Sequence, residues 1–566
     1  MKSNIYTVLL WLFAGLVVCS SCNKKLSEYN PSGLTSATVY TTAKGFETLV
    51  NAAYTYDRFW YGKEEGYQVS EMGTDIWTSG TGDVYPQLTQ YNNLQGANTS
   101  ALTLLWNNFY DAINLCNTGI NSISKVADYT DQQKAIREGE LRFLRAFYYW
   151  HIAETWGGVH FTTETSQGAV TTANKTSVDT IYNQIFTDLN FAVKNLPATT
   201  SDYGRATSTV AKAFLARMYL TRGKNAEAAA MANAVIATNG LKLLPKYGDL
   251  WNMGNLKNSE VIWAIDYSTN LANNDLTTTA YPYGHSRGSN SGHLLYLMVY
   301  DQVNTTLLTR DIGNGRPFNR YMPTLALLNM FDPTMDSRYA SSFQDVWYCN
   351  LPKDTVKKVA GNNFNKSDVS TFKAGDTVCY CPEVALPTSV TNAKHYTTYD
   401  ISRVYDATGI PSQRKFYVSL KKFKDSTRTS VAEAQSVRDV FVMRLAEMYL
   451  IAAEAQFNLG RSDSAAYFIN QIRTRAAIPG HEADMQITPA QVTLDFILDE
   501  RARELCGEQL RWFDLKRTGK LLDRVKRLNP DAAQYIQPFH VVRPIPQTQI
   551  DAVTNKTEFT QNDGYQ

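Results

Sequence analysis

This 566-residue chain has little charge and no recognisable catalytic motif. Charged residues make up 19% of it, below the roughly 25% of average soluble proteins. The formal net charge is +2 and no basic stripe or long lysine/arginine run is present, so nucleic-acid binding is not expected. The sequence also lacks a Walker loop, a dinucleotide fingerprint, HExxH and GxSxG. It therefore predicts no catalytic residue, cofactor or metal site.

Long apolar runs are scarce as well, and the one that matters is at the N-terminus. Lys2 precedes an apolar run over residues 5–18, which is typical of a secretory leader and is too short to span a bilayer stably. Residues 1–21 are therefore predicted to be a signal peptide. Cys22 resembles the lipidated cysteine of bacterial lipoproteins and would begin the mature chain. Residues 22–34 are polar and are predicted to be a lipidated tether.

Cysteine supplies no disulfide framework. Beyond the leader and Cys22, an odd number of cysteines remains, which leaves at least one thiol unpaired. An exported chain permits a bond from Cys349 to Cys379 or to Cys381, and the sequence does not choose between them. A zinc site at Cys379 and Cys381 is disfavoured, because one residue rather than two separates these cysteines and no histidine lies close. Cys116 and Cys506 are interpreted as small buried hydrophobes.

Two long stretches place many charges among apolar positions. Residues 136–160 read IREGELRFLRAFYYWHIAETWGGVH and follow a capping box at Thr130 and Gln133. Residues 498–521 read LDERARELCGEQLRWFDLKRTGKL and follow a helix start signal at Thr488. Each is predicted to be a buried helix, and the two are expected to be neighbours. Their ions are interpreted as structural, since so many buried charges need partners on adjoining helices.

Both stretches resemble signatures of the SusD/RagB-like family of outer-membrane nutrient-binding lipoproteins from Bacteroidetes-type bacteria. The upstream match is E-x-R-F-L-R-A-F-Y-Y followed by W-G-G-V, and the downstream matches are E-R-x-R-E-L and R-W-F-D-L-K-R-T-G. The resemblance implies a non-enzymatic receptor, lipid-anchored at the outer membrane and facing the cell surface. It also implies a ligand, a glycan or related nutrient, and a partner, a SusC-type TonB-dependent transporter that receives it.

Two segments align with each other when they are placed by their glycines, Gly223 and Gly460. Each has an alanine seven residues before the glycine and another five residues after it, which are Ala216, Ala228, Ala453 and Ala465. Small residues there let two antiparallel helices approach closely, as in tetratricopeptide helix pairs. The alternative is two unrelated helical hairpins. Further helices that would extend the stack are predicted over residues 104–123, 131–155 and 178–196.

The predicted fold class is mainly α, with a tetratricopeptide-like helical scaffold and an inserted loop-rich lobe containing short strands. The scaffold comprises residues 35–279 and 437–566. The inserted lobe, residues 280–436, is rich in Gly, Asn, Ser and Tyr and contains short strand-like pieces such as residues 414–420. It is predicted to bind the ligand.

Aromatic residues make up 12% of the chain, and the predicted site consists of aromatics in loops. An exposed aromatic face stacks on a sugar ring while polar neighbours fix the hydroxyl groups. Loop composition selects as candidates Trp60, Tyr61, Asp75, Trp77, Tyr85, Tyr281, Tyr283, His285, Arg287, Trp347 and Tyr348. Trp77 and Tyr283 are the predicted platforms, and Asp75 and Arg287 the predicted hydrogen-bonding partners. The alternative for each aromatic is ordinary packing, because tryptophan is highly buried on average.

Two other functions remain open at this point. A peptide-binding receptor of the same uptake system is the first, since the resemblance includes peptide uptake. A surface glycoside hydrolase or lyase is the second, because the geometry of paired catalytic carboxylates is set in space and leaves no fixed sequence spacing.

Overall fold

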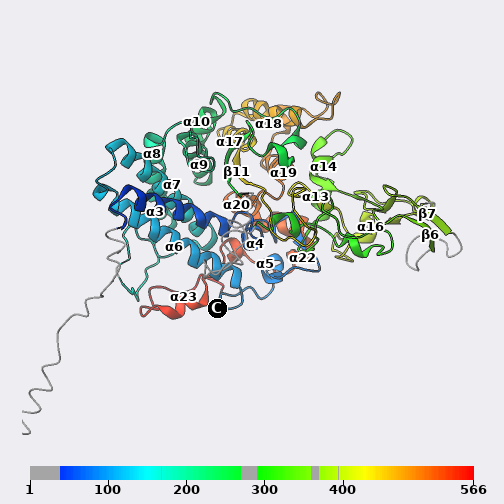
Figure 1. Ribbon diagram of the computed structural model, residues 1–566, viewed down its shortest axis with the longest axis horizontal. Helices are drawn as coiled ribbons and strands as arrows, with labels where there is room; N and C mark the ends of the chain where they lie inside the picture. The colour runs from blue at the N-terminus through cyan, green and yellow to red at the C-terminus, as the bar shows by residue number, and fades with distance from the viewer. Residues whose placement is uncertain (1–38, 167, 269–289, 358–368, 393) are drawn as a thin grey trace, which may run out of the picture.

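The computed structural model describes residues 39–166, 168–268, 290–357, 369–392 and 394–566. Helices dominate it and stack in chain order across two distant parts of the sequence (Figure 1). The stack consists of α3 (Ala43–Thr55), α6 (Ser100–Ser122), α7 (Asp131–Trp156), α8 (Val178–Asn195), α9 (Ser208–Thr221), α10 (Asn225–Ile236), α17 (Leu445–Asn458) and α18 (Ser462–Ala476). Helix α10 packs directly on α17. The predicted mainly α fold is therefore confirmed.

The two predicted helix pairs are α9–α10 and α17–α18. Gly223 and Gly460 turn the chain between the helices with φ of +67° and +75°, a left-handed conformation that glycine adopts without steric cost. The four alanines chosen by the alignment are all fully buried. Because α10 also packs on α17, the two pairs are consecutive layers of one stack, as the tetratricopeptide-like reading predicts. The three further predicted helices are confirmed as α6, α7 and α8.

Helix α7 begins where the sequence predicts. The Thr130 side chain accepts the Gln133 N–H at 3.2 Å, and the Gln133 side chain accepts the Thr130 N–H at 2.9 Å. Together they satisfy two donors at the helix start. Further along the stack, Gly119 lets α6 approach its neighbours, because a Cβ there would lie 2.4 Å from Leu141 Cδ1 and 2.7 Å from Leu49 Cδ2.

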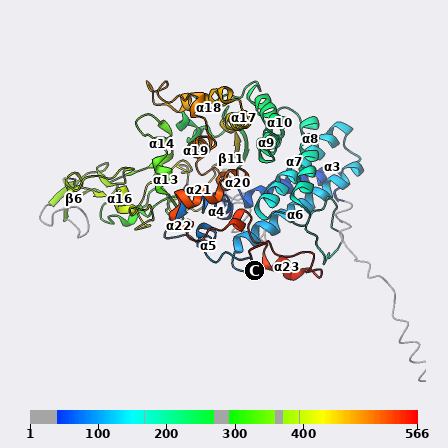
Figure 2. The same cartoon turned by 180° about the vertical axis from the view of Figure 1, so that it is seen from behind.

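The strands are short and form small sheets. The pairs are β1 (Trp77–Ser79) with β3 (Tyr321–Pro323), β2 (Val261–Ile265) with β11 (Val440–Arg444), β4 (Phe343–Gln344) with β10 (Ser419–Leu420), and β6 (Lys353–Lys357) with β7 (Val369–Phe372), while β8 (Thr377–Tyr380) lies between β5 (Val346–Tyr348) and β9 (Thr397–Thr398). Because β2 and β11 pair antiparallel, the chain between them leaves the helical stack and returns at one place. Strands β6 and β7 lie at the far end of an arm that projects from the body in both views (Figures 1 and 2).

The C-terminal charged stretch differs from the single helix that was predicted. The capping box at Thr488 forms, but it opens only a 3-10 turn, η7 (Pro489–Gln491). Helix α19 (Leu494–Glu504) has its own N-cap at Thr493, and α20 (Arg511–Arg517) follows after a break. Gly507 and Gln509 lie in this break with φ of +73° and +62°, a conformation that cannot continue a right-handed helix.

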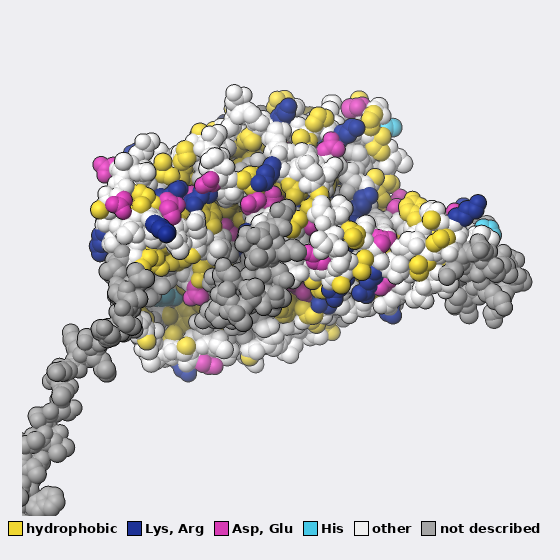
Figure 3. Space-filling view, in the orientation of Figure 1, with side chains coloured by type: hydrophobic (Ala, Val, Ile, Leu, Met, Phe, Trp, Pro, Cys, Tyr) yellow, Lys and Arg dark blue, Asp and Glu magenta, His cyan; other side chains and the backbone are white. Residues whose placement is uncertain are grey.

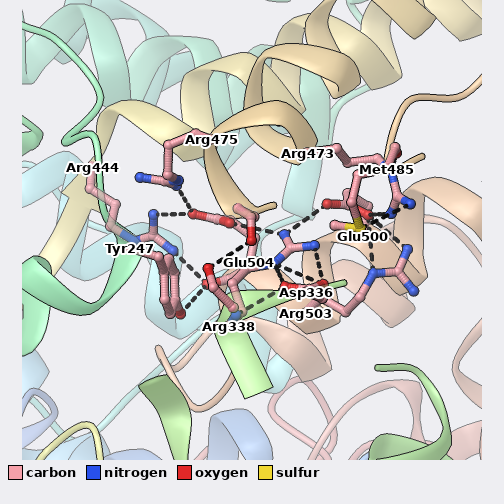
Figure 4. Close-up of polar contacts among 12 residues, drawn as sticks. Tyr247, Asp336, Arg338, Arg444, Arg473, Arg475, Met485, Glu500, Arg503 and Glu504 are labelled. Atoms are coloured by element: carbon pink, nitrogen blue, oxygen red, sulfur yellow. Dashed lines mark hydrogen bonds and ion pairs between the residues drawn. The ribbon is translucent and has the colours of Figure 1, made fainter. Parts of the chain in front are cut away.

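The charges of this stretch join elements that are distant in sequence (Figure 4). Arg338 of α14 (Ser337–Ser342) lies 2.7 Å from Glu500 and 3.0 Å from Glu504, and all three side chains are fully buried. Arg444 at the end of β11 binds Glu504 at 2.7 Å, and Arg473 of α18 binds Glu500 at 2.9 Å. These pairs connect the helical stack to the region between β2 and β11, which supports the structural interpretation of the charges.

The two charged stretches do lie together, although few of their ions pair with each other. Lys516 of α20 reaches Glu154 of α7 at 3.0 Å, and the rings of Phe513 and Trp150 have centroids 4.9 Å apart. Arg145 of α7 instead pairs with Asp188 of α8 at 2.8 Å.

The five cysteines in the described part of the chain are all free and buried. Because Cys349, Cys379 and Cys381 are all free, neither of the alternative disulfides from Cys349 is formed. The Cys379 and Cys381 sulfur atoms lie at hydrogen-bond distance, 3.9 Å apart. Within the described ranges, no helix combines the length and the apolar character needed to cross a membrane.

Candidate functional site

The tryptophans chosen from loop composition are packing residues. Trp60 and Trp77 are fully buried and Trp347 is 1% exposed, so none of them offers a ring face to a ligand. Trp60 packs in the helical core between Phe109 and Phe513, at 5.8 and 5.9 Å. Trp77 belongs to a second core shared by residues 67–77 and the region after residue 295. Their burial therefore corrects the prediction of Trp77 as a platform and of Trp60 and Trp347 as ligand-binding residues.

Asp75 is also buried, and its carboxylate is ion-paired. Arg511 holds it in a two-pronged pair at 2.7 and 2.6 Å, and Arg524 adds a contact at 2.6 Å. Burial alone raises the pKa of a carboxyl, but the two arginines outweigh it and hold the pKa of Asp75 below its ordinary value. Because Asp75 is fully buried and both of its oxygens face arginines, it is not accessible to a sugar hydroxyl.

Tyr85 and Tyr348 are the predicted aromatics that retain accessible surface. Tyr85 is half-buried, and its hydroxyl donates to Glu65 at 3.4 Å. Tyr348 is 53% exposed, but it lies on the arm next to the buried Trp347. Cys22, Tyr281, Tyr283, His285 and Arg287 lie outside the described residues, and their predicted roles stay predictions.

Tyr267 and Asn290, which flank the undescribed residues 269–289, are held by two consecutive residues, Asp439 and Arg438. The Tyr267 N–H donates to Asp439 at 2.9 Å, and the Asn290 side chain donates to the Arg438 carbonyl at 2.8 Å. The Tyr267 hydroxyl donates to the Tyr61 carbonyl at 2.6 Å. Tyr267 therefore lies against the predicted cluster at residues 60–62.

A surface of aromatic and basic side chains lies on two loops that pair with each other close to Asn290. It is called the Phe318 face here and consists of Val84, Tyr85, Arg316, Phe318 and Arg320. Loop 80–82 pairs with residues 319–320, through Gly80 N–H to the Arg320 carbonyl and Gly82 N–H to the Asn319 carbonyl, both at 2.8 Å. Residues 318–320 in turn donate to carbonyl oxygens of residues 294–297, which follow directly from Asn290.

The ring of Phe318 is half-buried and flanked by two cations. The guanidinium carbons of Arg316 and Arg320 lie 5.3 and 5.1 Å from its centre. Arg320 also lies 2.7 Å from Glu64, and burial raises the pKa of Glu64 to about 7. Val84 at the edge is 46% exposed. Aromatic, apolar and paired polar groups on one accessible surface can stack on a ring and bind its hydroxyls.

A pocket of ≈ 240 Å³ lies beside the end of β2, with Ala264, Ile265 and Asp266 in its lining. Polar side chains line much of it, among them Asn51, Asp57, Arg58, Asp202, Tyr203, Arg205 and Asp266. A second, larger hollow of ≈ 580 Å³ shares Asp266 with it. Acidic and basic side chains are interspersed with apolar ones over the molecular surface seen in Figure 3, so no single-sign field marks this side of the described protein.

Sequence reasoning missed Phe318, although its signal was present. The loop RDIGNGRPFNRY has glycine and asparagine around an aromatic residue, and an arginine stands two residues before and two after that aromatic. This pattern met the criterion by which Trp77 was chosen. Among the described residues, no group of three or more His, Cys, Asp or Glu side chains is arranged to hold a metal ion.

Solved structures share this fold over nearly the whole chain. A laminarin-binding SusD-like protein superimposes with a TM-score of 0.69 at 22% identity, covering 93% of this chain and all of that one. Surface glycan-binding protein A from Bacteroides thetaiotaomicron, solved in complex with laminarihexaose, gives a TM-score of 0.66 at 20% identity, with 92% and 99% covered.

Curated relatives give the same result from sequence. SusD-like protein P25 from Formosa agariphila is 25% identical over 471 residues, covering 81% of this chain and 79% of the relative. A SusD-like protein from Bacteroides ovatus is 24% identical over 544 residues, covering 91% and 83%. The family model described as starch-binding associating with outer membrane matches residues 45–220. The model described as the SusD family matches residues 259–565, more than half of the sequence, and the chain therefore belongs to the SusD family.

Proposed function

We propose that this protein is a non-enzymatic glycan receptor, lipid-anchored through Cys22 at the outer membrane. The Phe318 face would contact the ligand, and a SusC-type TonB-dependent transporter would receive it. The main support for this site is the partly exposed ring of Phe318. The guanidinium carbons of Arg316 and Arg320 lie 5.3 and 5.1 Å from its centre. Family membership and the laminarin and laminarihexaose named for two structural neighbours support a carbohydrate ligand.

The first experiment measures binding of the mature protein to a panel of oligosaccharides that includes laminarihexaose, with a peptide panel beside it. Phe318→Ala removes the proposed platform and should weaken glycan binding by about 1–3 kcal/mol, by analogy with base stacking on aromatic side chains. Its melting temperature should change little, because the ring is only partly buried. Tyr535→Ala is the matched control, since Tyr535 is a 41% exposed aromatic outside the Phe318 face.

The outcomes separate the alternatives. Weaker glycan binding by Phe318→Ala alone supports the site, and equal binding by parent and variant removes it. Saturable binding to peptides with none to glycans would favour the peptide receptor, and new reducing ends in the glycan mixture would favour a hydrolase. Tyr283→Ala belongs in the same series, since Tyr283 remains a predicted platform.

The anchor and the partner have tests of their own. Replacing Cys22 with Ala should release the protein from the membrane fraction or leave its leader uncut, because acylation at that residue holds it there. Gentle detergent extraction of the parent should bring down a large outer-membrane protein. Mass spectrometry that finds Cys22 unmodified would remove the anchor from the proposal.

A further inference from the structure

Four basic side chains, one in the Phe318 face and three behind it, bind backbone carbonyl oxygens where a carboxylate would be expected. Arg428 donates to the carbonyls of Asp425, Ile312 and Glu433, each at 3.2 Å. Of the other three side chains, Arg438 donates to the carbonyls of Trp251 and Lys424, and Arg316 donates to that of Ala432. Lys424 donates to the Gly313 carbonyl and to the side-chain amide oxygen of Gln344. Arg428 and Arg438 are buried, and Lys424 is half-buried. They are called the carbonyl-capped cluster here, together with Arg316.

This pattern differs from that of several other buried arginines in the described protein, although Arg543, which is fully buried and donates to the Val69 carbonyl, resembles it. Buried arginines such as Arg338, Arg444 and Arg511 each have carboxylate partners within 3 Å. A buried cation with carbonyl partners alone is not neutralised, and its desolvation is only partly offset. Burial, the largest cause, together with neighbouring cations lowers the pKa of Lys424 to about 7, and burial lowers that of Arg438 to about 10. The cluster therefore favours an added negative charge.

Asp425 supplies one nearby negative charge, but its carboxylate already accepts hydrogen bonds from its own loop. Its carboxylate accepts hydrogen bonds from the Ser436 hydroxyl at 2.7 Å and from the Val437 N–H at 3.1 Å. Glu433 likewise accepts from the Thr429 N–H at 2.7 Å. These acids hold the loop around the cluster, and neither forms an ion pair with Arg316, Arg428, Arg438 or Lys424 in the part of the chain that the structure describes.

A second observation is an unused hydrogen-bond donor beside the carbonyl-capped cluster. His293 is 3% exposed, and neither ring nitrogen has a hydrogen-bond partner. Burial, assisted by Arg428, lowers its pKa to about 3, so the ring is neutral and carries one free N–H. Next along the chain, the Leu294 carbonyl accepts the Phe318 N–H at 3.0 Å. An unsatisfied buried polar group of this kind calls for an explanation.

Arg316 connects the cluster to the surface, because it is half-buried and its guanidinium lies over the Phe318 ring. We propose that the ligand of the Phe318 face carries an anionic group, a uronate carboxylate or a sulfate ester, which Arg316 binds. This inference rests on the proposed glycan-receptor function. Arginine matches both groups because its planar fork of donors fits two oxygens of one anion. Behind Arg316, the positive field comes from Arg428, Arg438 and Lys424. The His293 N–H is a further hydrogen-bond donor there.

The test compares glycans of equal length and different charge: laminarihexaose as the neutral probe, a hexameric oligogalacturonate as the carboxylate probe, and a sulfated galactan hexamer as the sulfate probe. The parent should bind at least one anionic probe ten-fold or more tightly than the neutral probe, and its affinity should fall as salt rises. Arg316→Met should remove most of that preference and flatten the salt dependence, while Arg316→Lys should restore part of both. Arg310→Met is the control, because Arg310 is a 41% exposed neighbour paired with Asp301.

The result also separates this inference from the proposed function. If the neutral probe binds as well as both anionic probes, or if Arg316→Met leaves the preference intact, the anionic-ligand inference is wrong. In that case weaker neutral binding by Phe318→Ala would still support a glycan site. If no glycan binds under any condition, both the proposed function and this inference fail.

Discussion

Asp57 illustrates how one residue sets a pH dependence. It lines the ≈ 240 Å³ pocket but is 1% exposed, and neither carboxyl oxygen has a hydrogen-bond partner. Burial raises its pKa from 3.8 to about 8. The folded protein therefore keeps the proton over a range in which the unfolded chain has lost it. Stability must then fall as pH rises across that window.

Asp57→Asn should remove this penalty. At pH 4 the variant and the parent should be about equally stable, and the variant should gain up to about 1.4 kcal/mol per pH unit above that, until pH 8. Urea unfolding at several pH values measures the difference. Asp202→Asn is the control, because Asp202 lines the same pocket with a side chain that is 64% exposed. A constant difference between variant and parent at all pH values would contradict the prediction.

At the scale of elements, the helix turns of the two repeat pairs can be tested by substitution. A Cβ at Gly223 or Gly460 would meet nothing within 4 Å, so Ala there adds no clash and carries only the conformational cost of positive φ. We expect each Gly→Ala variant to lose about 1–2 kcal/mol. Gly→Asn should lose less, since asparagine tolerates the left-handed region. Equal losses for Ala and Asn in denaturant unfolding would point to packing as the cause.

Sequence reasoning succeeded where the determinants are local. The Thr130–Gln133 capping box and the glycines of the two helix pairs act within a few residues, so their outcome is visible in the printed sequence. Trp77 shows why the site was harder. Its loop is rich in Gly, Ser and Thr, but β1 pairs with β3, and Trp77 lies opposite Pro323, 246 positions later in the chain. This pairing buries the ring. The residues next to Trp77 in the sequence do not predict this contact.

On the scale of the whole molecule, the buried ion cluster joins elements that the chain separates widely. Glu504 is fully buried and contacts Arg338, Arg444 and Arg475 from α14, β11 and α18. Burial alone raises the pKa of Glu504, but these arginines outweigh it and hold the pKa at about 2. The stability that this depressed pKa contributes is complete above the ordinary value of 4.5 and is lost as pH falls from there toward 2.

Arg338→Met should therefore weaken the entire fold. It leaves Glu500 and Glu504 with fewer partners in a dry environment, and removing one member of a buried pair typically costs about 3–5 kcal/mol. Arg527→Met is the control, because Arg527 is 49% exposed and its carboxylate contacts are 3.5 Å or longer, so its loss should stay below about 1 kcal/mol. Because the Arg338 variant raises the pKa of both glutamates toward their unfolded values, its acid unfolding should occur at a higher pH than that of the parent. Hydrogen exchange at α14 and at α18 should report one shared loss of protection. If only α14 becomes less protected while α18 keeps its parental exchange rate, the cluster stabilises α14 locally and does not unite the two parts of the fold.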